Sequence, residues 1–165
     1  MEGPLRYGMV MQLPKDLATS CYYGRGPVEN YADRKLSQRI GIYRQTAQEQ
    51  FYPYIRPQET GTHTDIRWWQ QTDGSGNGFT VTADGTFSAS ALHYDVATLD
   101  EGDYKRQRHV QQLTESPYVN LSIDCMHAGV GGIDSWGGNA EALTPYRIPY
   151  ADRTFHFSIK PISRK

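Results

Sequence analysis

The stretch YYGRGPVENYADRK, residues 22 to 35, carries several polar side chains in close succession. Among them, Glu29, Asn30 and Arg34 supply a carboxylate, an amide and a guanidinium, the groups that hydrogen-bond sugar hydroxyls. The G-x-G at its start does not predict a dinucleotide loop, because Pro27 follows and no helical pattern comes after it. Two interpretations stay open: a sugar-contacting loop, and a rigid turn whose side chains satisfy the backbone and each other.

A second group of titratable residues lies in YPYIRPQETGTHTDIRWW, residues 52 to 69. Its prolines hold the backbone extended, and Glu59, His63, Asp65 and Arg67 then follow within nine residues. Glu59 and His63 are conceivable as a general base and its partner. Such a cluster is more often a hydrogen-bonded network, and one histidine with one carboxylate is a weak metal signal. We therefore predict no metal site here.

The third stretch, NLSIDCMHAGVGGIDSWGGN, spans residues 120 to 139. A strand-like run delivers His127, glycines turn the backbone, and Asp134 and Trp136 follow. Trp136 is either a plug folded onto its own domain or an aromatic platform presented to a ligand. An indole can stack on the apolar C–H face of a pyranose, while the edges of that sugar require hydrogen bonds.

These residues must be positioned by strands, because short alternating or β-branched and aromatic runs recur between turn signals. The glycine-rich DGSGNG at 73–78 predicts a loop, and ADGT at 83–86 predicts a hairpin turn. Asp95 is a candidate N-cap for one short helix at about 95–101. The sequence thus predicts an all-β sandwich. The expected strands are Leu5–Leu13, Ala18–Tyr23, Leu36–Gln45, Ile66–Gln71, Gly78–Ala83, Thr86–His93, Tyr118–Met126 and Thr154–Ile162.

The composition limits the function classes. The 165 residues fit one domain or a large piece of one, and a net charge of −1 provides no long-range field toward nucleic acid or an anionic membrane. No apolar run approaches the roughly 20 residues of a spanning helix. Cys21 and Cys125 fall in strand-like runs, so we expect buried free thiols rather than a disulfide. The first residues resemble no signal peptide, which means little if the chain was cut from a longer one. A cytoplasmic location is favoured, and export stays open.

In this order, the three stretches resemble the carboxy-terminal domain of lac-type β-galactosidases of glycoside hydrolase family 2. The family patterns G-x-G-P-x-E-N-Y-x-D-R, P-Y-x-x-P-x-E-N-G and H-x-G-(I/V)-G-G-x-D-S-W match residues 24–34, 53–61 and 127–136. The resemblance covers nearly all of residues 1–165. It departs at Thr60, which occupies the asparagine position of E-N-G, at RWW (67–69) and in the tail after Pro161.

The resemblance implies a β-supersandwich similar to galactose mutarotases, of which this chain represents about the second half. In the family, the tryptophan of D-S-W, here Trp136, reaches the active site of a neighbouring barrel domain and stacks on the bound sugar. The remaining candidates for sugar contact or loop organisation are Glu29, Asn30, Arg34, Glu59, Arg67, His127 and Asp134.

The resemblance also implies that the catalytic glutamates, the magnesium ion and a monovalent cation belong to other domains. We therefore expect this chain to carry no cofactor and to hydrolyse no β-galactoside alone. Its expected partners are the barrel domain of the same enzyme, a β-galactoside, and further copies in a homo-oligomer. Two alternatives stay open, a purely structural module and a mutarotase-like aldose epimerase.

Overall fold

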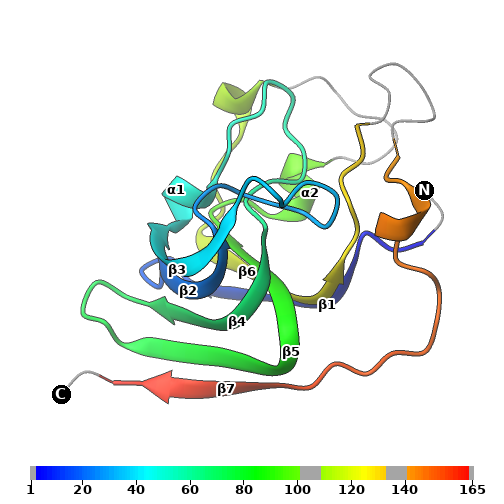
Figure 1. Ribbon diagram of the computed structural model, residues 1–165. Coiled ribbons are helices and arrows are strands. Elements are labelled where there is room, and N and C mark those ends of the chain that lie inside the picture. Colours follow the sequence, from blue (N-terminus) through cyan, green and yellow to red (C-terminus); the bar gives the residue numbers. More distant parts are fainter. Residues whose placement is uncertain (1–2, 101–108, 133–140, 164–165) are drawn as a thin grey trace.

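The computed structural model describes residues 3–100, 109–132 and 141–163 (Figure 1). Seven strands pair antiparallel in one sheet of order β1-β6-β5-β4-β2-β3, and β7 pairs with β5. No helix in the described part of the chain is long and apolar enough to cross a membrane. The expected all-β class is confirmed. The strands are β1 (Arg6–Pro14), β2 (Thr19–Gly26), β3 (Arg39–Thr46), β4 (His63–Thr72), β5 (Gly78–Leu92), β6 (Tyr118–His127) and β7 (Phe157–Ile162).

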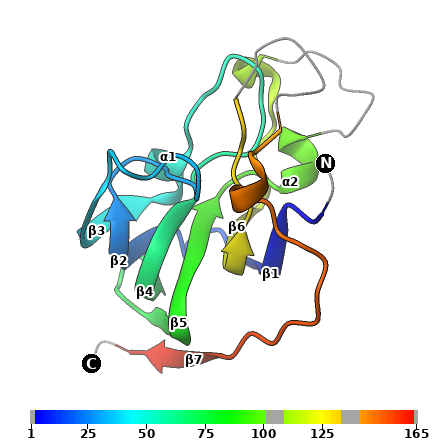
Figure 2. The same ribbon diagram turned by 45° about the vertical axis from the view of Figure 1, so that its right-hand side comes forward.

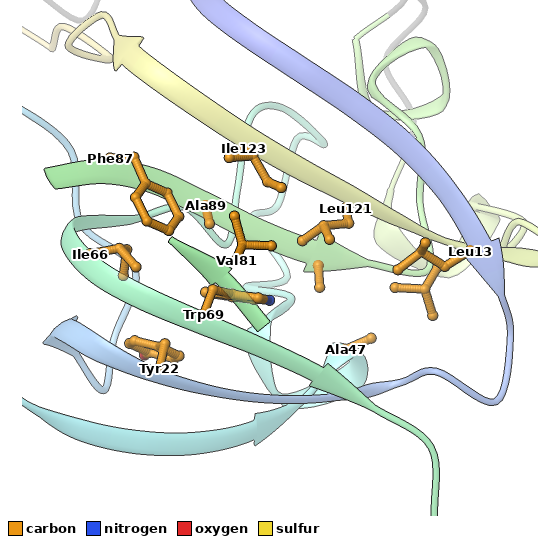
Figure 3. Packing of buried hydrophobic residues seen from close by; sticks show 12 residues of the cluster. Leu13, Tyr22, Ala47, Ile66, Trp69, Val81, Phe87, Ala89, Leu121 and Ile123 are labelled. Atoms are coloured by element: carbon orange, nitrogen blue, oxygen red, sulfur yellow. The ribbon is translucent and has the colours of Figure 1, made fainter. Parts of the chain in front are cut away.

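The hydrophobic core is one cluster of buried side chains, mainly from the strands (Figure 3). Buried residues alternate with more exposed ones along β2, whereas residues 87–92 of β5 and 119–124 of β6 are buried throughout. Trp69 is fully buried and stacks on Tyr22, with ring centroids 5.0 Å apart and planes 12° apart. Its indole N–H donates to Gln71 Oε1 at 2.9 Å, so the polar end of the ring is also satisfied. The core brings β1, β2, β4, β5 and β6 together around these side chains.

The predicted hairpin turn at 83–86 is wrong, because β5 runs without interruption from Gly78 to Leu92. Its first half pairs with β7, its second half pairs with β6, and β4 pairs along both halves with register shifts. The paired residues lie on both sides of residues 84–86, with β4 at one edge and β7 and then β6 at the other. This pairing keeps the short segment between them extended. The tight connection falls instead at 73–77, where the predicted loop is confirmed between β4 and β5.

The helical segments are short. The expected cap is confirmed: Asp95 accepts a hydrogen bond from Thr98 N at 2.7 Å and precedes α2 (Val96–Leu99). The sequence analysis missed α1 (Ala47–Gln50), although Thr46 and Glu49 form a capping box at its start. Two further single turns are 3₁₀ helices, at Val110–Gln112 and Thr144–Tyr146.

Both cysteines are free, as expected, and both lie in strands. The expectation that they are buried is wrong, because each is half-buried. Cys21 lies between Ser20 and Tyr22, which are fully buried. Since neighbouring side chains on a strand point to opposite faces, Cys21 lies on the outer face of the sheet.

Candidate functional site

The three polar stretches come together through direct contacts. The loop before β4 and the segment after β6 rise on the same side of the sheet (Figure 2). Glu59 of that loop lies 3.5 Å from His127 Nε2 at the end of β6, and the Tyr31 ring contacts the His127 ring edge-on, with centroids 5.3 Å apart. Residues almost 100 positions apart in sequence therefore form one cluster.

Glu29 fastens the loop after β2 to the loop before β4. Its side chain is only 4% exposed, and it accepts hydrogen bonds from Gly61 N at 2.6 Å and from Thr60 Oγ1 at 3.1 Å. It also pairs with the Arg34 guanidinium and accepts from the Tyr54 hydroxyl. Both carboxylate oxygens are therefore occupied within the chain, which fits a loop-organising role.

Asn30 ties the same loop to β4. It is fully buried, and its amide nitrogen donates to Arg25 O at 3.1 Å and to Val28 O at 3.0 Å. Its amide oxygen accepts from Thr64 N at 3.0 Å and from the Thr64 hydroxyl. The backbone N–H of Asn30 donates to Thr62 O at 2.7 Å. No capacity is left for a sugar hydroxyl, because the amide uses both of its donors and its acceptor.

Arg34 lies closer to solvent than its neighbours, with 45% of its side chain exposed. Its guanidinium carbon sits 5.0 Å from the Tyr31 ring centroid and 5.8 Å from that of Tyr54, both within cation–π range. It also donates to the Tyr54 hydroxyl at 2.6 Å. Arg34 thus completes the Glu29 network and covers it from the solvent side.

A second part of the cluster is centred on Arg6, at the start of β1. Its Nη2 lies 2.6 Å from Glu59 Oε2, and its Nη1 donates to Ser122 Oγ at 2.7 Å and lies 3.4 Å from Asp124 Oδ2. The Arg6 and Glu59 side chains are 16% and 14% exposed, and that of Asp124 is 1% exposed. One guanidinium therefore faces two largely buried carboxylates.

The two carboxylates respond differently to this environment. Burial raises the pKa of Asp124 to about 6, and the nearby Arg6 offsets only part of that effect. For Glu59, burial also opposes ionisation, but the hydrogen bond with His127 and the charge of Arg6 outweigh it, and the pKa lies below its usual value. Glu59 is therefore the ionised partner of Arg6.

His127 contacts the backbone next to it and the side chains of Arg6 and Glu59. Its Nδ1 lies 2.7 Å from Ala128 O, and since a carbonyl only accepts, Nδ1 carries the proton. Its Nε2 lies 3.2 Å from Arg6 Nη2 and 3.5 Å from Glu59 Oε1, with which it makes the hydrogen bond that lowers the pKa of Glu59. Both ring nitrogens are engaged at the point where the chain leaves β6.

Glu59 and His63 do not form the acid–base pair that their spacing suggested. His63 is fully buried, and burial lowers its pKa to about 3, so it is neutral. Its Nδ1 lies 3.1 Å from the Tyr22 hydroxyl. Within the described residues, no group of three or more His, Cys, Asp or Glu side chains could hold a metal ion.

Arg67 lies outside this cluster. Its guanidinium carbon is 5.2 Å from the Tyr23 ring centroid, and it donates to the carbonyl of Asp65. Asp65 adopts a positive φ of 55° and pairs with Arg25 at 2.5 Å and with Lys35 at 3.0 Å. The titratable residues of the second stretch therefore have different partners: Glu59 pairs with Arg6, His63 contacts Tyr22, and Asp65 pairs with Arg25 and Lys35.

Asp134 and Trp136 fall at 133–140, outside the described residues. The backbone immediately before them is described, and it is held by Asp33. Its Oδ1 accepts from Val130 N at 3.2 Å, and its Oδ2 accepts from Gly131 N at 2.9 Å. Sequence reasoning missed Asp33 as a candidate, although it lies inside the E-N-Y-x-D-R pattern.

Sequence reasoning also missed Arg6, for which no local signal exists. Its partners lie 53 to 121 positions away along the chain, so only the fold brings them together. A small cavity of about 40 Å³ beside Arg6, Glu59 and Asn120 is lined in part by residues of α2. That volume is far below the roughly 300 Å³ of a small-molecule pocket, so the cavity cannot admit a sugar ring.

Comparison with known proteins identifies the family. Residues 2–160 match the family model described as beta galactosidase small chain. The chain is 35% identical over 157 residues to a beta-galactosidase of Priestia megaterium, covering 94% of this chain and 14% of that protein. It is 40% identical over 132 residues to the Lactobacillus delbrueckii subsp. bulgaricus beta-galactosidase, covering 79% and 12%.

Beta-galactosidase BgaC of Bifidobacterium adolescentis is 37% identical over 157 residues, which cover 93% of this chain and 14% of that protein. The chain thus spans about one-seventh of the length of such relatives. The matched region contains all three polar stretches, strands β1 to β6 and the first four residues of β7. On this evidence, the chain belongs to the beta-galactosidase small chain family.

Proposed function

We propose that this chain is a non-catalytic part of a β-galactosidase that completes the sugar-binding site of that enzyme. Its partner would be the part of the enzyme that carries the catalytic barrel, either in the same polypeptide or as a large chain. Its substrate would be a terminal β-D-galactoside such as lactose. The proposal rests on family membership and on the short share of the relatives that the chain spans.

The observation that carries the non-catalytic assignment is the engagement of the cluster's carboxylates. A retaining glycosidase needs two carboxyl groups about 5–5.5 Å apart that face the scissile bond. Glu29 has both oxygens occupied, Asp33 holds two backbone N–H groups, and Glu59 pairs with Arg6. Asp124 makes no hydrogen bond through its carboxylate oxygens, but it is fully buried beside Arg6. These groups organise loops, and they offer no free pair to a substrate.

Within this proposal, Trp136 is the residue that contacts the sugar, and the cluster supports the segment that carries it. Magnesium and a monovalent cation would be bound by other domains of the enzyme. The enzyme would assemble as a homo-oligomer. The polar residues of the cluster would act on the sugar only through the loops that they hold.

The epimerase alternative receives less support from the geometry. It needs a carboxylate base and a histidine acid that converge on one sugar ring. The cavity beside Glu59 is small, and His127 is engaged at both ring nitrogens. A larger cavity of about 320 Å³ is lined by Glu29 and His63, but His63 is buried and neutral and Glu29 has both oxygens occupied. A coupled assay of α-galactose conversion by the purified chain tests this alternative, and we expect no activity.

The deciding experiment is Trp136→Ala in the β-galactosidase that contains this chain, with Trp68→Ala as the matched control. Trp68 is a half-buried strand residue beside Tyr23, with ring centroids 6.5 Å apart. Loss of a stacking contact with its buried area corresponds to about 2 kcal/mol, roughly a 30-fold rise in KM. We expect that rise for Trp136→Ala with unchanged thermal stability, and an unchanged KM for Trp68→Ala.

Two outcomes would count against the proposal. A loss of about 3–5 kcal/mol of stability in Trp136→Ala, with KM unchanged, would identify that residue as a core plug and the chain as a structural module. Turnover of a chromogenic galactoside by the purified chain alone would show that it carries its own catalytic groups.

A further inference from the structure

We propose that Asp33 is a positioning residue for sugar binding, acting through the backbone that leads to Trp136. The inference rests on the proposed function, because it assumes that Trp136 contacts the sugar. It goes beyond that function by assigning the residue that orients the start of the tryptophan segment. Asp33 itself would touch no substrate.

The first argument is the geometry of the carboxylate. Its two oxygens accept from two successive backbone N–H groups, Val130 at 3.2 Å and Gly131 at 2.9 Å. Hydrogen bonds to an ionised acceptor are about twice as strong as neutral ones. A pair of such bonds from neighbouring residues fixes the orientation of the peptide plane as well as its position. Asp33 therefore fixes the orientation of the backbone at residues 130 and 131, just before the segment that carries Trp136.

The second argument is the fit between Asp33 and the glycines. A Cβ on Gly129 would lie 2.4 Å from Asp33 Oδ2, which is closer than real Cβ contacts. Gly131 and Gly132 adopt φ values of 81° and 93°, in the left-handed region that favours glycine. The backbone thus approaches the carboxylate in a conformation that other residues adopt only with strain.

The third argument is that both Asp33 and the turn are tied to the sheet. Gly129 N donates to Tyr146 O at 2.8 Å, and Ala128 N donates to Leu5 O at 2.8 Å, so the turn is held beside residues before β1 and after position 140. Arg34 N donates to Tyr31 O at 2.9 Å, closing the turn that contains Asp33. Asn30 then links this loop to β4. A continuous set of hydrogen bonds connects the sheet to the backbone before residue 133.

The experiment is a double-mutant cycle between Asp33→Ala and Trp136→Ala in the β-galactosidase that contains this chain. Asp73→Ala is the matched control, because Asp73 also accepts from two backbone N–H groups of a glycine-containing turn, Ser75 at 2.8 Å and Asn77 at 2.9 Å. That turn joins β4 to β5 and has no part in the cluster.

We expect Asp33→Ala to raise KM about tenfold, since it removes two charge-assisted hydrogen bonds that orient the segment. In the Trp136→Ala background, the same change should raise KM less than twofold, because the group that it positions is gone. Asp73→Ala should leave KM within twofold of the unmodified enzyme. Asp33→Asn keeps one carbonyl oxygen as an acceptor, so its KM should lie between those of the unmodified enzyme and Asp33→Ala.

The outcomes separate this inference from the proposed function. A Trp136→Ala enzyme with normal KM would overturn both. A raised KM in Trp136→Ala with a normal KM in Asp33→Ala, or effects that multiply in the double variant, would overturn the role of Asp33 alone. Should Asp33→Ala not fold, the cycle is run with Asp33→Asn. Hydrogen exchange of the Val130 and Gly131 amides in that variant must then accelerate, and unchanged exchange would also refute the inference.

Discussion

Replacing Asn30 with aspartate keeps the shape of the side chain but puts an oxygen in place of the amide nitrogen, which donates two hydrogen bonds. The new carboxylate can still accept from Thr64 N and from the Thr64 hydroxyl. The position of the amide nitrogen, however, lies 3.1 Å from Arg25 O and 3.0 Å from Val28 O, and both of these groups only accept. An ionised oxygen there would face two carbonyl oxygens in a fully buried site.

The expected cost follows from these contacts. Two carbonyl groups lose their donor, at about 1 kcal/mol each, and a buried charge lacks a cation, so Asn30→Asp should lose about 3–5 kcal/mol at pH 8. Protonation of the introduced carboxyl group restores one of the two lost hydrogen-bond donors. The folded state therefore holds the proton more tightly than the unfolded state, and the pKa of the introduced carboxyl is raised. The penalty is smallest below the unfolded pKa of about 4 and grows as the pH rises through the folded pKa.

The assay is urea denaturation of the chain at pH 5 and pH 8, followed by tryptophan fluorescence, to which the buried Trp69 contributes. Gln12→Glu is the matched control, because it makes the same amide-to-carboxylate change at an exposed strand position. The control should change the free energy of unfolding by about 0.5 kcal/mol or less. If Asn30→Asp behaved like the control at pH 8, or lost the same stability at both pH values, the assigned hydrogen-bond network would be wrong.

Two further perturbations test the cluster and the sheet. Burial raises the pKa of Asp124 to about 6, so its contribution to stability is present near pH 4 and is lost as the pH rises to about 6, on the order of 2–3 kcal/mol. In Asp124→Asn, the denaturation midpoint should change less with pH between pH 4 and 7 than in the unmodified chain. The same pH dependence in both would contradict the raised pKa of Asp124. Gly8→Ala would place a Cβ 2.2 Å from Ile123 O and should cost about 2 kcal/mol or more, whereas Gly85→Ala meets nothing within 4 Å. Equal denaturation midpoints for these two variants would refute the β1–β6 register.

Much of the fold could be predicted from local patterns, because alternation along a strand reports which face is buried. The expected strand at Tyr118–Met126 agrees with β6 to within one residue, and the Asp95 cap and the loop at 73–78 were also recognised. The capping box of Thr46 and Glu49 was a readable signal for α1 that was overlooked. These features depend on residues close together in the chain, so the sequence alone carries them.

Long-range pairing was decided only by the tertiary structure. ADGT at 83–86 has the composition of a turn, yet it stays extended because β4 on one side and β7 and β6 on the other pair along β5. The half-burial of the cysteines likewise depends on which face of the finished sheet they occupy. A local pattern states a preference, and many simultaneous contacts can override it.

The candidate site divides in the same way. By itself, the sequence identified which residue types gather in three stretches, and through its resemblance it determined the family. The sequence could not show that Glu29 and Asn30 use their hydrogen-bonding groups within the chain. It also could not show that Arg6 and Asp33 belong to the same cluster. The sequence shows that a polar group is present, but only the folded chain decides whether that group faces a partner within the protein or a ligand outside it.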